Sequence, residues 1–135
     1  MGQAAGHPSV PPSAAPATPA PPLAARQEET ENAGWSEAEL IIARCAFDRA
    51  QQRAIRGLVE AVQAQSRALD GVESVWHLHD FLSIQRHAIE GRFDFRLAGL
   101  LFVFASLVRD ELLSLEELEG LEAVKLAKIA AMSRF

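Results

Sequence analysis

The sequence predicts an all-α protein with a long N-terminal helix and a small helical head. We expect it to form a two-fold homodimer through coiled-coil-like helix packing. Three observations support this prediction. All seven prolines lie between Pro8 and Pro22. From Trp35 to Phe135 the apolar residues recur at helical spacing, without the alternation of a strand. A row along the first predicted helix alternates steps of three and four residues, which is the coiled-coil pattern.

The Pro/Ala-rich segment of residues 1–34 is predicted to be a disordered tail. It has no periodic apolar positions, so it cannot bury enough surface to offset the entropy of ordering. A targeting signal is the competing interpretation. Prolines interrupt every apolar stretch that a secretory signal would need, and Arg26 is the tail's single arginine, whereas a transit peptide is arginine-rich. Residues 35–135 are therefore the predicted folded domain.

The first predicted helix spans residues 36–69. Ser36 can cap it, Glu39 can complete a capping box, and Trp35 can pack on Leu40. Asp70-Gly71 follows its last turn. Its main apolar row consists mostly of small residues, and a second row beside it repeats every seven residues; the two rows are Leu40, Ala43, Phe47, Ala50, Ala54, Gly57, Ala61, Ala64 and Ala68, and then Ile55, Val62 and Leu69.

These rows are the basis for the predicted dimer. A helix that is apolar along its whole length is hard to cover with the roughly 65 residues that follow it. A second copy of the chain would cover it most simply through a two-fold interface. The alternative is that the long helix packs against the later helices of its own chain.

Two further helices are expected after the first. One spans residues 73–90 and stops at Gly91, and the next spans residues 95–110, with Asp94 as its cap. The latter is apolar nearly all round and is predicted to be the centre of the compact part. Its most apolar run, residues 97–108, is about 12 residues long. A bilayer-spanning helix needs roughly 20, so we expect no transmembrane segment.

The C-terminal part is predicted to hold a short helix, residues 115–119, and a last helix, residues 121–133. Ser114 and Glu117 have the spacing of a second capping box, and Gly120 ends the short helix. The last helix is expected to have an apolar inner face and a basic end that suits the helix dipole; these are Leu121, Val124, Ile129 and Met132 on the face, and Lys125, Lys128 and Arg134 at the end.

The helix predicted at residues 73–90 carries two neighbouring rows. One can serve as a core face: Val75, Leu78, Leu82 and Ile89. The other places a tryptophan among polar groups: Trp76, Asp80, Ser83 and His87. A fold does not need such a row for its own packing, and tryptophan and arginine are enriched at the energetic centres of protein interfaces. The alternative is that Trp76 covers the core, while Asp80 pairs with Arg86 or His87 near the surface and contributes little.

Charge and cysteine content exclude several function classes. The net charge of -5 and the pI near 5.3 argue against nucleic acid or an anionic membrane as the partner. The single cysteine, Cys45, cannot form an internal disulfide, which fits a reducing compartment, so we expect a cytoplasmic protein.

No catalytic constellation is visible in the sequence. His79-Asp80 is the dipeptide that supplies two ligands in metal phosphohydrolases, but a fitting upstream His is lacking. His77 and His79 lie on nearly opposite faces of a helix and cannot hold one ion together. Cys45 on an apolar helix face is more typical of a small hydrophobic residue than of a nucleophile. We therefore expect no enzyme activity, no cofactor and no metal.

One string of residues resembles the fluorescence recovery protein family. It runs from Trp76 through Ser83 as WHLHDFLS and continues with Arg86-His87, Gly91, Asp94, Arg96 and residues 102–105. The resemblance extends from Trp35 to Phe135 and excludes the tail. Members of this family are cyanobacterial regulators of photoprotection by the orange carotenoid protein.

The resemblance implies an all-helical homodimer without enzymatic activity. Such a protein binds the photoactivated orange carotenoid protein, mainly its C-terminal domain, and speeds its return to the resting form, which ends energy quenching at the phycobilisome. Through that partner it would also reach the thylakoid. The alternative is a helical dimer of the same family that acts on another partner, such as a related carotenoid-binding protein, in a host without phycobilisomes.

The resemblance also implies two groups of contact residues. Trp76, His79, Asp80 and Arg86 match the family's dimer interface and the adjoining partner-binding surface, and His87 lies in the same row. Phe102 and Lys128 match a second group in the head, which is proposed to touch the partner.

Overall fold

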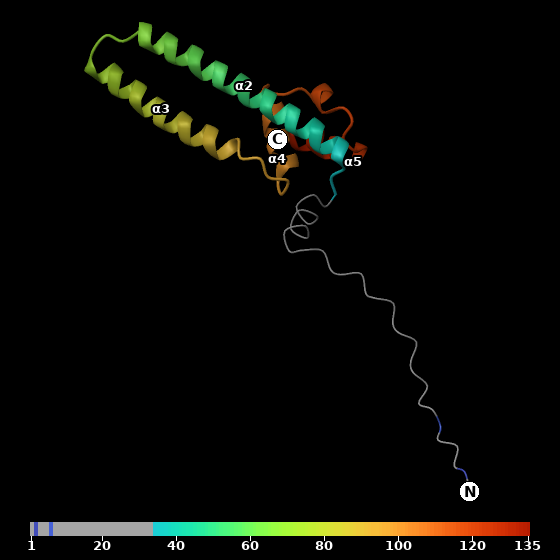
Figure 1. The fold of residues 1–135 in the computed structure, drawn as a ribbon. Helices are drawn as coiled ribbons and strands as arrows, with labels where there is room; N and C mark the ends of the chain where they lie inside the picture. Colours follow the sequence, from blue (N-terminus) through green and yellow to red (C-terminus); the bar gives the residue numbers. More distant parts are fainter. Residues whose placement is uncertain (1, 3–5, 7–33) are drawn as a thin grey trace.

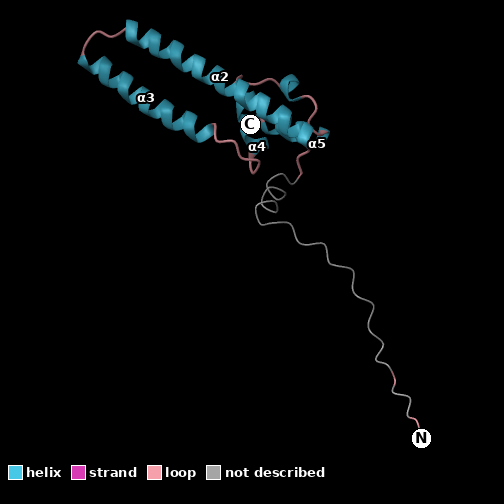
Figure 2. Ribbon diagram, viewed as in Figure 1, coloured by secondary structure: helices cyan, strands magenta, loops and turns pink. Residues whose placement is uncertain are grey.

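The computed structural model describes Gly2, Gly6 and residues 34–135. Apart from Gly2, Gly6 and Gly34, the predicted tail lies outside the described residues. The described elements are all helical, which confirms the all-α prediction (Figures 1 and 2). They are α2 (Glu37–Arg67), α3 (Val72–Arg92), α4 (Leu100–Arg109), the 3-10 helix η1 (Leu115–Leu118) and α5 (Ala123–Met132).

The elements form two regions that share one helix. Helices α2 and α3 make a long antiparallel hairpin, while α4, η1 and α5 gather around the N-terminal part of α2 (Figure 1). We call α2 up to Ala50, together with residues 93–135, the head. We call the rest of α2, together with α3, the stem. The long first helix and the small head are thus as predicted.

The N-terminus of α2 has the predicted capping box. The Ser36 Oγ accepts the Glu39 N–H at 3.1 Å, and the Ser36 N–H donates to the Glu39 carboxylate at 3.0 Å. Residues within four positions of each other are enough to build this cap, so the sequence predicts it reliably. The helix then runs to Arg67, two residues short of the predicted end.

The hydrophobic core lies entirely in the head. Phe47 meets Phe93 and Phe95 edge to face, with ring centroids 5.5 and 5.2 Å apart. Burying a large apolar side chain contributes about 1.5–3 kcal/mol, so this cluster supplies most of the packing energy. Its fully or nearly buried members are Ala43, Ala46, Phe47, Ala50, Leu100, Phe104, Ala105, Leu107, Leu113, Leu118, Leu121 and Ile129.

The stem has no comparable core, because α3 contains no buried residue. The face of α3 that is half-buried differs from the predicted core face: Leu78 and Ile89 belong to it, whereas Val75 and Leu82 are exposed. Its members are Ser74, Leu78, Phe81, Gln85, Ile89 and Arg92. Phe81, rather than its neighbour Leu82, therefore points to α2, and the two are 100° apart around a helix.

The chain between α3 and α4 corrects the predicted third helix. Helix α3 passes through Gly91 to Arg92, and α4 begins only at Leu100, after Gly99 with a left-handed φ of 79°. Asp94 is not a helix cap and instead pairs with Arg96 at 2.7 Å. The intervening non-helical segment carries Phe93 and Phe95 onto Phe47, and this tertiary contact overrides the local helical pattern.

Phe102 is the exception to the prediction that this helix is apolar and buried nearly all round. Its side chain is 67% exposed, although Phe104, two residues away, is completely buried.

The short helix is held as its sequence predicts. The Ser114 N–H donates to the Glu117 carboxylate at 3.1 Å, and Gly120 follows with φ at 104°. The positive φ favours glycine at this position, and a Cβ there would also push against the tip of the Ile42 side chain.

The inner face of α5 was predicted only in part. Leu121 and Ile129 are buried and Met132 is half-buried, but Val124 is exposed and Lys125 is buried. Helix α5 begins at Ala123, so the helical phase cannot be extrapolated from Leu121. None of the described helices is long and apolar enough to cross a membrane.

Candidate protein-binding surfaces

The outer face of α3 is the first candidate surface. The half-buried residues of α3 face α2, so the residues half a turn away point outward. Trp76 is 60% exposed there, which contradicts the alternative that it covers the core. We define the outer α3 face by the five predicted site residues that lie on this side of the helix and are all exposed: Trp76, His79, Asp80, Arg86 and His87.

The charged groups of the outer α3 face have only weak partners within the chain. His79 Nδ1 lies 3.3 Å from Asp80 Oδ1, and Arg86 Nε donates to Glu90 at 3.0 Å. Asp80 therefore does not pair with Arg86 or His87. Pairs this exposed add little to stability, because water and salt screen them. Asp80 and Arg86 thus remain accessible to another protein.

A second surface is apolar and lies along one side of the stem. On α2 its members are Ile55 and Val59, one turn apart, and on α3 they include Val75 and Leu82, the exposed residues of the predicted core face. Leu69 lies in the turn between the two helices, and Val72 is the first residue of α3. Helical phase puts both sets on the same side of the hairpin, opposite the groove described below. We call this surface the apolar flank; its side chains are 38–63% exposed, and they are Ile55, Val59, Leu69, Val72, Val75 and Leu82.

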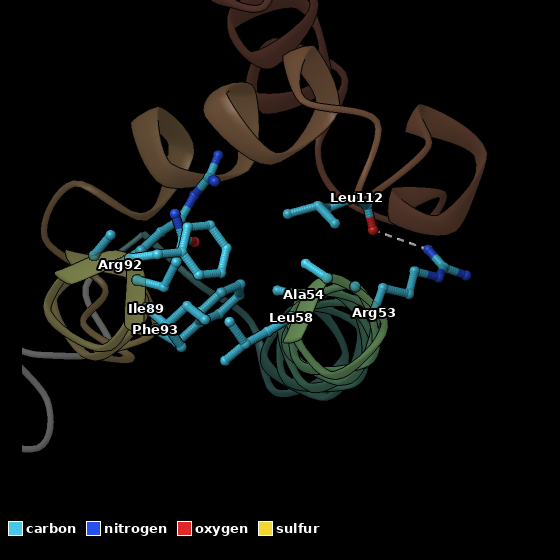
Figure 3. Close-up of a pocket in the computed structure, with 12 residues that line it drawn as sticks. Arg53, Ala54, Leu58, Ile89, Arg92, Phe93 and Leu112 are labelled. Atoms are coloured by element: carbon cyan, nitrogen blue, oxygen red, sulfur yellow. Dashed lines mark hydrogen bonds between the residues drawn. The ribbon is translucent and has the colours of Figure 1, made fainter. Parts of the chain in front are cut away.

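A cavity of about 310 Å³ lies at the elbow where the head meets the stem. Figure 3 shows it between α2, α3 and Leu112, with Ala54, Leu58 and Ile89 on its walls. Arg53 and Arg92 stand at its edge, but both have partners in the chain. Arg53 donates to the Leu112 carbonyl at 3.0 Å, and Arg92 donates to Asp110 at 2.6 Å. The cavity thus offers apolar walls and no free charge from these two arginines.

A buried ion pair fastens the start of α2 to α5. Lys125 Nζ lies 2.9 Å from both carboxylate oxygens of Glu39, and it also donates to the Gly34 carbonyl. Its ammonium stands 4.3 Å from the centre of the Trp35 ring, a cation–π contact. Backbone N–H groups of Glu122 and Ser36, together with Lys125, lower the Glu39 pKa to about 2. This pair was not predicted from the sequence, in which Lys125 was assigned to the basic end of the last helix.

A second ion pair holds η1 against the middle of α2. Arg53 makes two bonds to the Glu117 carboxylate, at 2.6 and 3.0 Å, and Arg49 adds a third at 3.1 Å. The hydrogen bond from Arg53 is the main cause that lowers the Glu117 pKa to about 2. Helical spacing indicates that Arg49 and Arg53 share a face of α2, but no local pattern identifies Glu117 as their partner.

The two predicted contact residues of the head are both exposed. Phe102 projects from α4 and Lys128 from α5. Val124, one turn before Lys128 on α5, is 62% exposed. The predicted site residues therefore fall into two groups on separate elements, one on α3 and one in the head.

Within residues 34–135, no group of three or more His, Cys, Asp or Glu side chains is placed to hold a metal ion. Cys45 is exposed rather than packed as a small hydrophobic residue.

The chain matches known proteins over its whole folded part. A family model described as photoprotection regulator fluorescence recovery protein matches residues 35–133. The fluorescence recovery protein of Synechocystis sp. is 43% identical over 106 residues, which is 78% of this chain and 97% of that protein.

Two solved structures agree with this match. The fluorescence recovery protein of Fremyella diplosiphon superposes with a TM-score of 0.73 at 40% identity, covering 76% of this chain and 100% of that one. The Synechocystis structure gives a TM-score of 0.71 at 44% identity, covering 75% and 99% of the two chains. The resemblance found in the sequence is confirmed, and the chain belongs to the fluorescence recovery protein family of photoprotection regulators.

Proposed function

We propose that this protein is a non-enzymatic regulator of the orange carotenoid protein. It binds the photoactivated form and speeds its return to the resting form, which ends quenching at the phycobilisome. Membership in a family of photoprotection regulators supports this class of function. The observation that carries the binding surface is Trp76, a tryptophan 60% exposed on a helix that has no buried residue.

The apolar flank supports a homodimer as the working form. Six large apolar side chains lie at 38–63% exposure along one side of the hairpin and its turn, and a contiguous exposed apolar patch is typical of a protein–protein interface. A second copy, related by a two-fold axis, would set the same flank against itself, so each side chain would find an apolar neighbour. Dimerisation would then leave the outer α3 face at the edge of the interface, where a further protein can reach it.

The proposed mechanism is acceleration by binding alone. A helper that prefers the compact form of its partner, or the barrier that leads to it, lowers the free energy needed to rejoin the partner's domains. Trp76 can supply apolar contact, and Asp80 and Arg86 can supply charge-assisted hydrogen bonds. A change of ~3 kcal/mol in barrier height accelerates a reaction more than a hundredfold. Phe102 and Lys128 would provide a second contact from the head.

The test is the dark reversion rate of photoactivated orange carotenoid protein with and without this chain. We expect acceleration by the native chain and its loss in Trp76→Ala, with unchanged helical content. Ile41→Ala is the matched control, because Ile41 is a large exposed apolar residue of α2 outside the outer α3 face. Equal acceleration by both variants would exclude Trp76 as a contact. No acceleration by a folded native chain would point to another partner.

A further inference from the structure

We propose that the Glu39–Lys125 ion pair positions the outward surface of α5 for its partner. Lys125 does not touch the partner in this account, and it acts through Lys128 and Val124, its neighbours on α5. The inference rests on the proposed function, because it assigns a role to the head contact named there.

The orientation of α5 depends strongly on Lys125. Only two of its ten residues are buried, Lys125 and Ile129, one helical turn apart. Ile129 and the half-buried Leu126 and Met132 hold α5 against the core, but apolar contacts are not directional and define the rotation about the helix axis less sharply. Lys125 adds bonds of defined geometry to both Glu39 oxygens at 2.9 Å. The pair therefore fixes which side of α5 faces the solvent.

Glu39 is itself held from three directions. Its carboxylate accepts the Ser36 N–H at 3.0 Å within the α2 cap and the Glu122 N–H at 3.0 Å at the start of α5. Lys125 then completes the arrangement and reaches on to the Gly34 carbonyl. One carboxylate thus joins the first turn of α2 to the first turn of α5, across 86 residues of sequence.

Rotation of α5 would move the proposed contact residues directly. Residues of a helix are 100° apart, so a rotation by one residue position would carry Lys128 and Val124 to another side of the head. Stability alone does not call for an ion pair at this place, because well-packed neutral side chains are often as stable as a buried pair. A defined orientation is what the charged pair adds.

The test removes both charges together and measures orientation and activity separately. In Glu39→Gln/Lys125→Met, Gln keeps a hydrogen-bond acceptor for the backbone and Met keeps the apolar stem of the lysine, so the domain should fold. The matched control is Glu117→Gln/Arg53→Met, which neutralises the other ion pair, the one that holds η1 rather than α5.

Orientation is measured between spin labels at Ala131→Cys on α5 and Glu60→Cys on α2, both exposed sites, in a Cys45→Ser background. The labelled full chain is diluted with an excess of unlabelled chain, so that distances within one chain dominate. We expect the distance distribution to shift or broaden in the Glu39/Lys125 variant and to stay unchanged in the control. An unchanged distribution in the Glu39/Lys125 variant would overturn the inference, whatever the partner is.

Activity is measured as the reversion rate of the orange carotenoid protein against the concentration of this chain. We expect the half-saturating concentration to rise on the order of tenfold in the Glu39/Lys125 variant, with the same rate at saturation. Because a loss of folded protein would also raise the half-saturating total concentration, the folded fraction of each variant is measured by circular dichroism and the rates are plotted against the concentration of folded chain. An altered distance with an unaltered concentration dependence would show that orientation does not matter to the partner. If the native chain gives no acceleration, the proposed function fails, and the distance measurement still decides on the role of the pair in orienting α5.

Discussion

The two halves of α2 have the same sequence pattern and different surroundings. In the first half, Ala43, Phe47 and Ala50 are buried by the head of their own chain. In the second half the same row is less buried: Ala54 and Ala61 are half-buried, and Gly57 and Ala64 are exposed. A periodic row thus indicates that a helix has a face that can be buried, but it does not indicate how far along the helix that burial extends.

This difference suggests that the head provides the stability of the fold and that the stem provides the surfaces for other proteins. The head holds the buried core and the Glu39–Lys125 pair, and Glu117 of the head binds Arg53 where the stem begins, whereas α3 has only half-buried contacts with α2. Binding surfaces are commonly drawn from the less stable parts of a fold, because those parts leave apolar groups uncovered. The predictions below test this division of roles, beginning with the largest expected effect.

Replacing two phenylalanines of α4 with alanine, one at a time, should show the contrast between the buried core and an exposed binding surface. Phe104→Ala should lower the free energy of unfolding by about 3–5 kcal/mol, because Phe104 is completely buried in the head core. Phe102→Ala should change it by less than about 0.5 kcal/mol, because its side chain is already in water. Urea denaturation of both variants measures the difference. Similar losses at the two sites would contradict the assignment of Phe102 to a binding surface.

A charge in the apolar flank should weaken the proposed dimer without unfolding the head. Val59→Asp would bury an unpaired carboxylate in the interface, and we expect the dissociation constant to rise roughly a hundredfold, or about 3 kcal/mol. Ala64→Asp is the control, since Ala64 is an exposed residue of α2 on another side of the stem. Sedimentation velocity over a dilution series distinguishes them. A dimer that tolerates Val59→Asp would place the interface elsewhere.

Acid should destabilise the head through its two depressed carboxyl groups. The pKa values of Glu39 and Glu117 fall from an ordinary 4.5 to about 2 in the folded chain. The unfolded chain therefore takes up protons first, and the stability that is fully present above pH ~4.5 is lost as the pH falls towards 2. We expect a loss of about 3 kcal/mol for each group.

Thermal unfolding followed by circular dichroism between pH 5 and pH 2 measures this loss. The Glu39→Gln/Lys125→Met variant should lose about half of the pH dependence, because only Glu117 remains to titrate with a depressed pKa. A pH dependence equal to that of the native chain would show that protonation of Glu39 does not contribute to the loss of stability in acid.

The smallest effect is expected at the turn after α4. Glu111 has a φ of 61°, the left-handed conformation that costs energy for any residue with a Cβ. Glu111→Gly should raise the free energy of unfolding by about 0.5–1 kcal/mol, because relief of this strain exceeds the added entropy of the unfolded chain. Glu111→Val should lower it. Urea denaturation measures the free energy of unfolding of both variants. A lower free energy of unfolding in Glu111→Gly would show that the backbone at Glu111 is not strained.

The structure also shows which kinds of information the sequence carries. The Ser36–Glu39 cap, the Ser114–Glu117 bond and the exposed row with Trp76 were predicted, because each depends on residues within a few helical turns. The non-helical segment before α4 and the burial of Lys125 were not, because each depends on partners far away in sequence. Pairing of Lys125 with Glu39 has no local signal at all.

Hydrogen–deuterium exchange over a dilution series tests most directly whether another chain covers the stem. The account predicts that the amides of α3 exchange faster as the protein is diluted, since they lose the second copy that shields the apolar flank. The amides of α4 should exchange at one slow rate throughout, because the head is closed by its own chain. Slow exchange in α3 at concentrations low enough for the protein to be monomeric would contradict this prediction, because the hairpin would then be stable without a second copy.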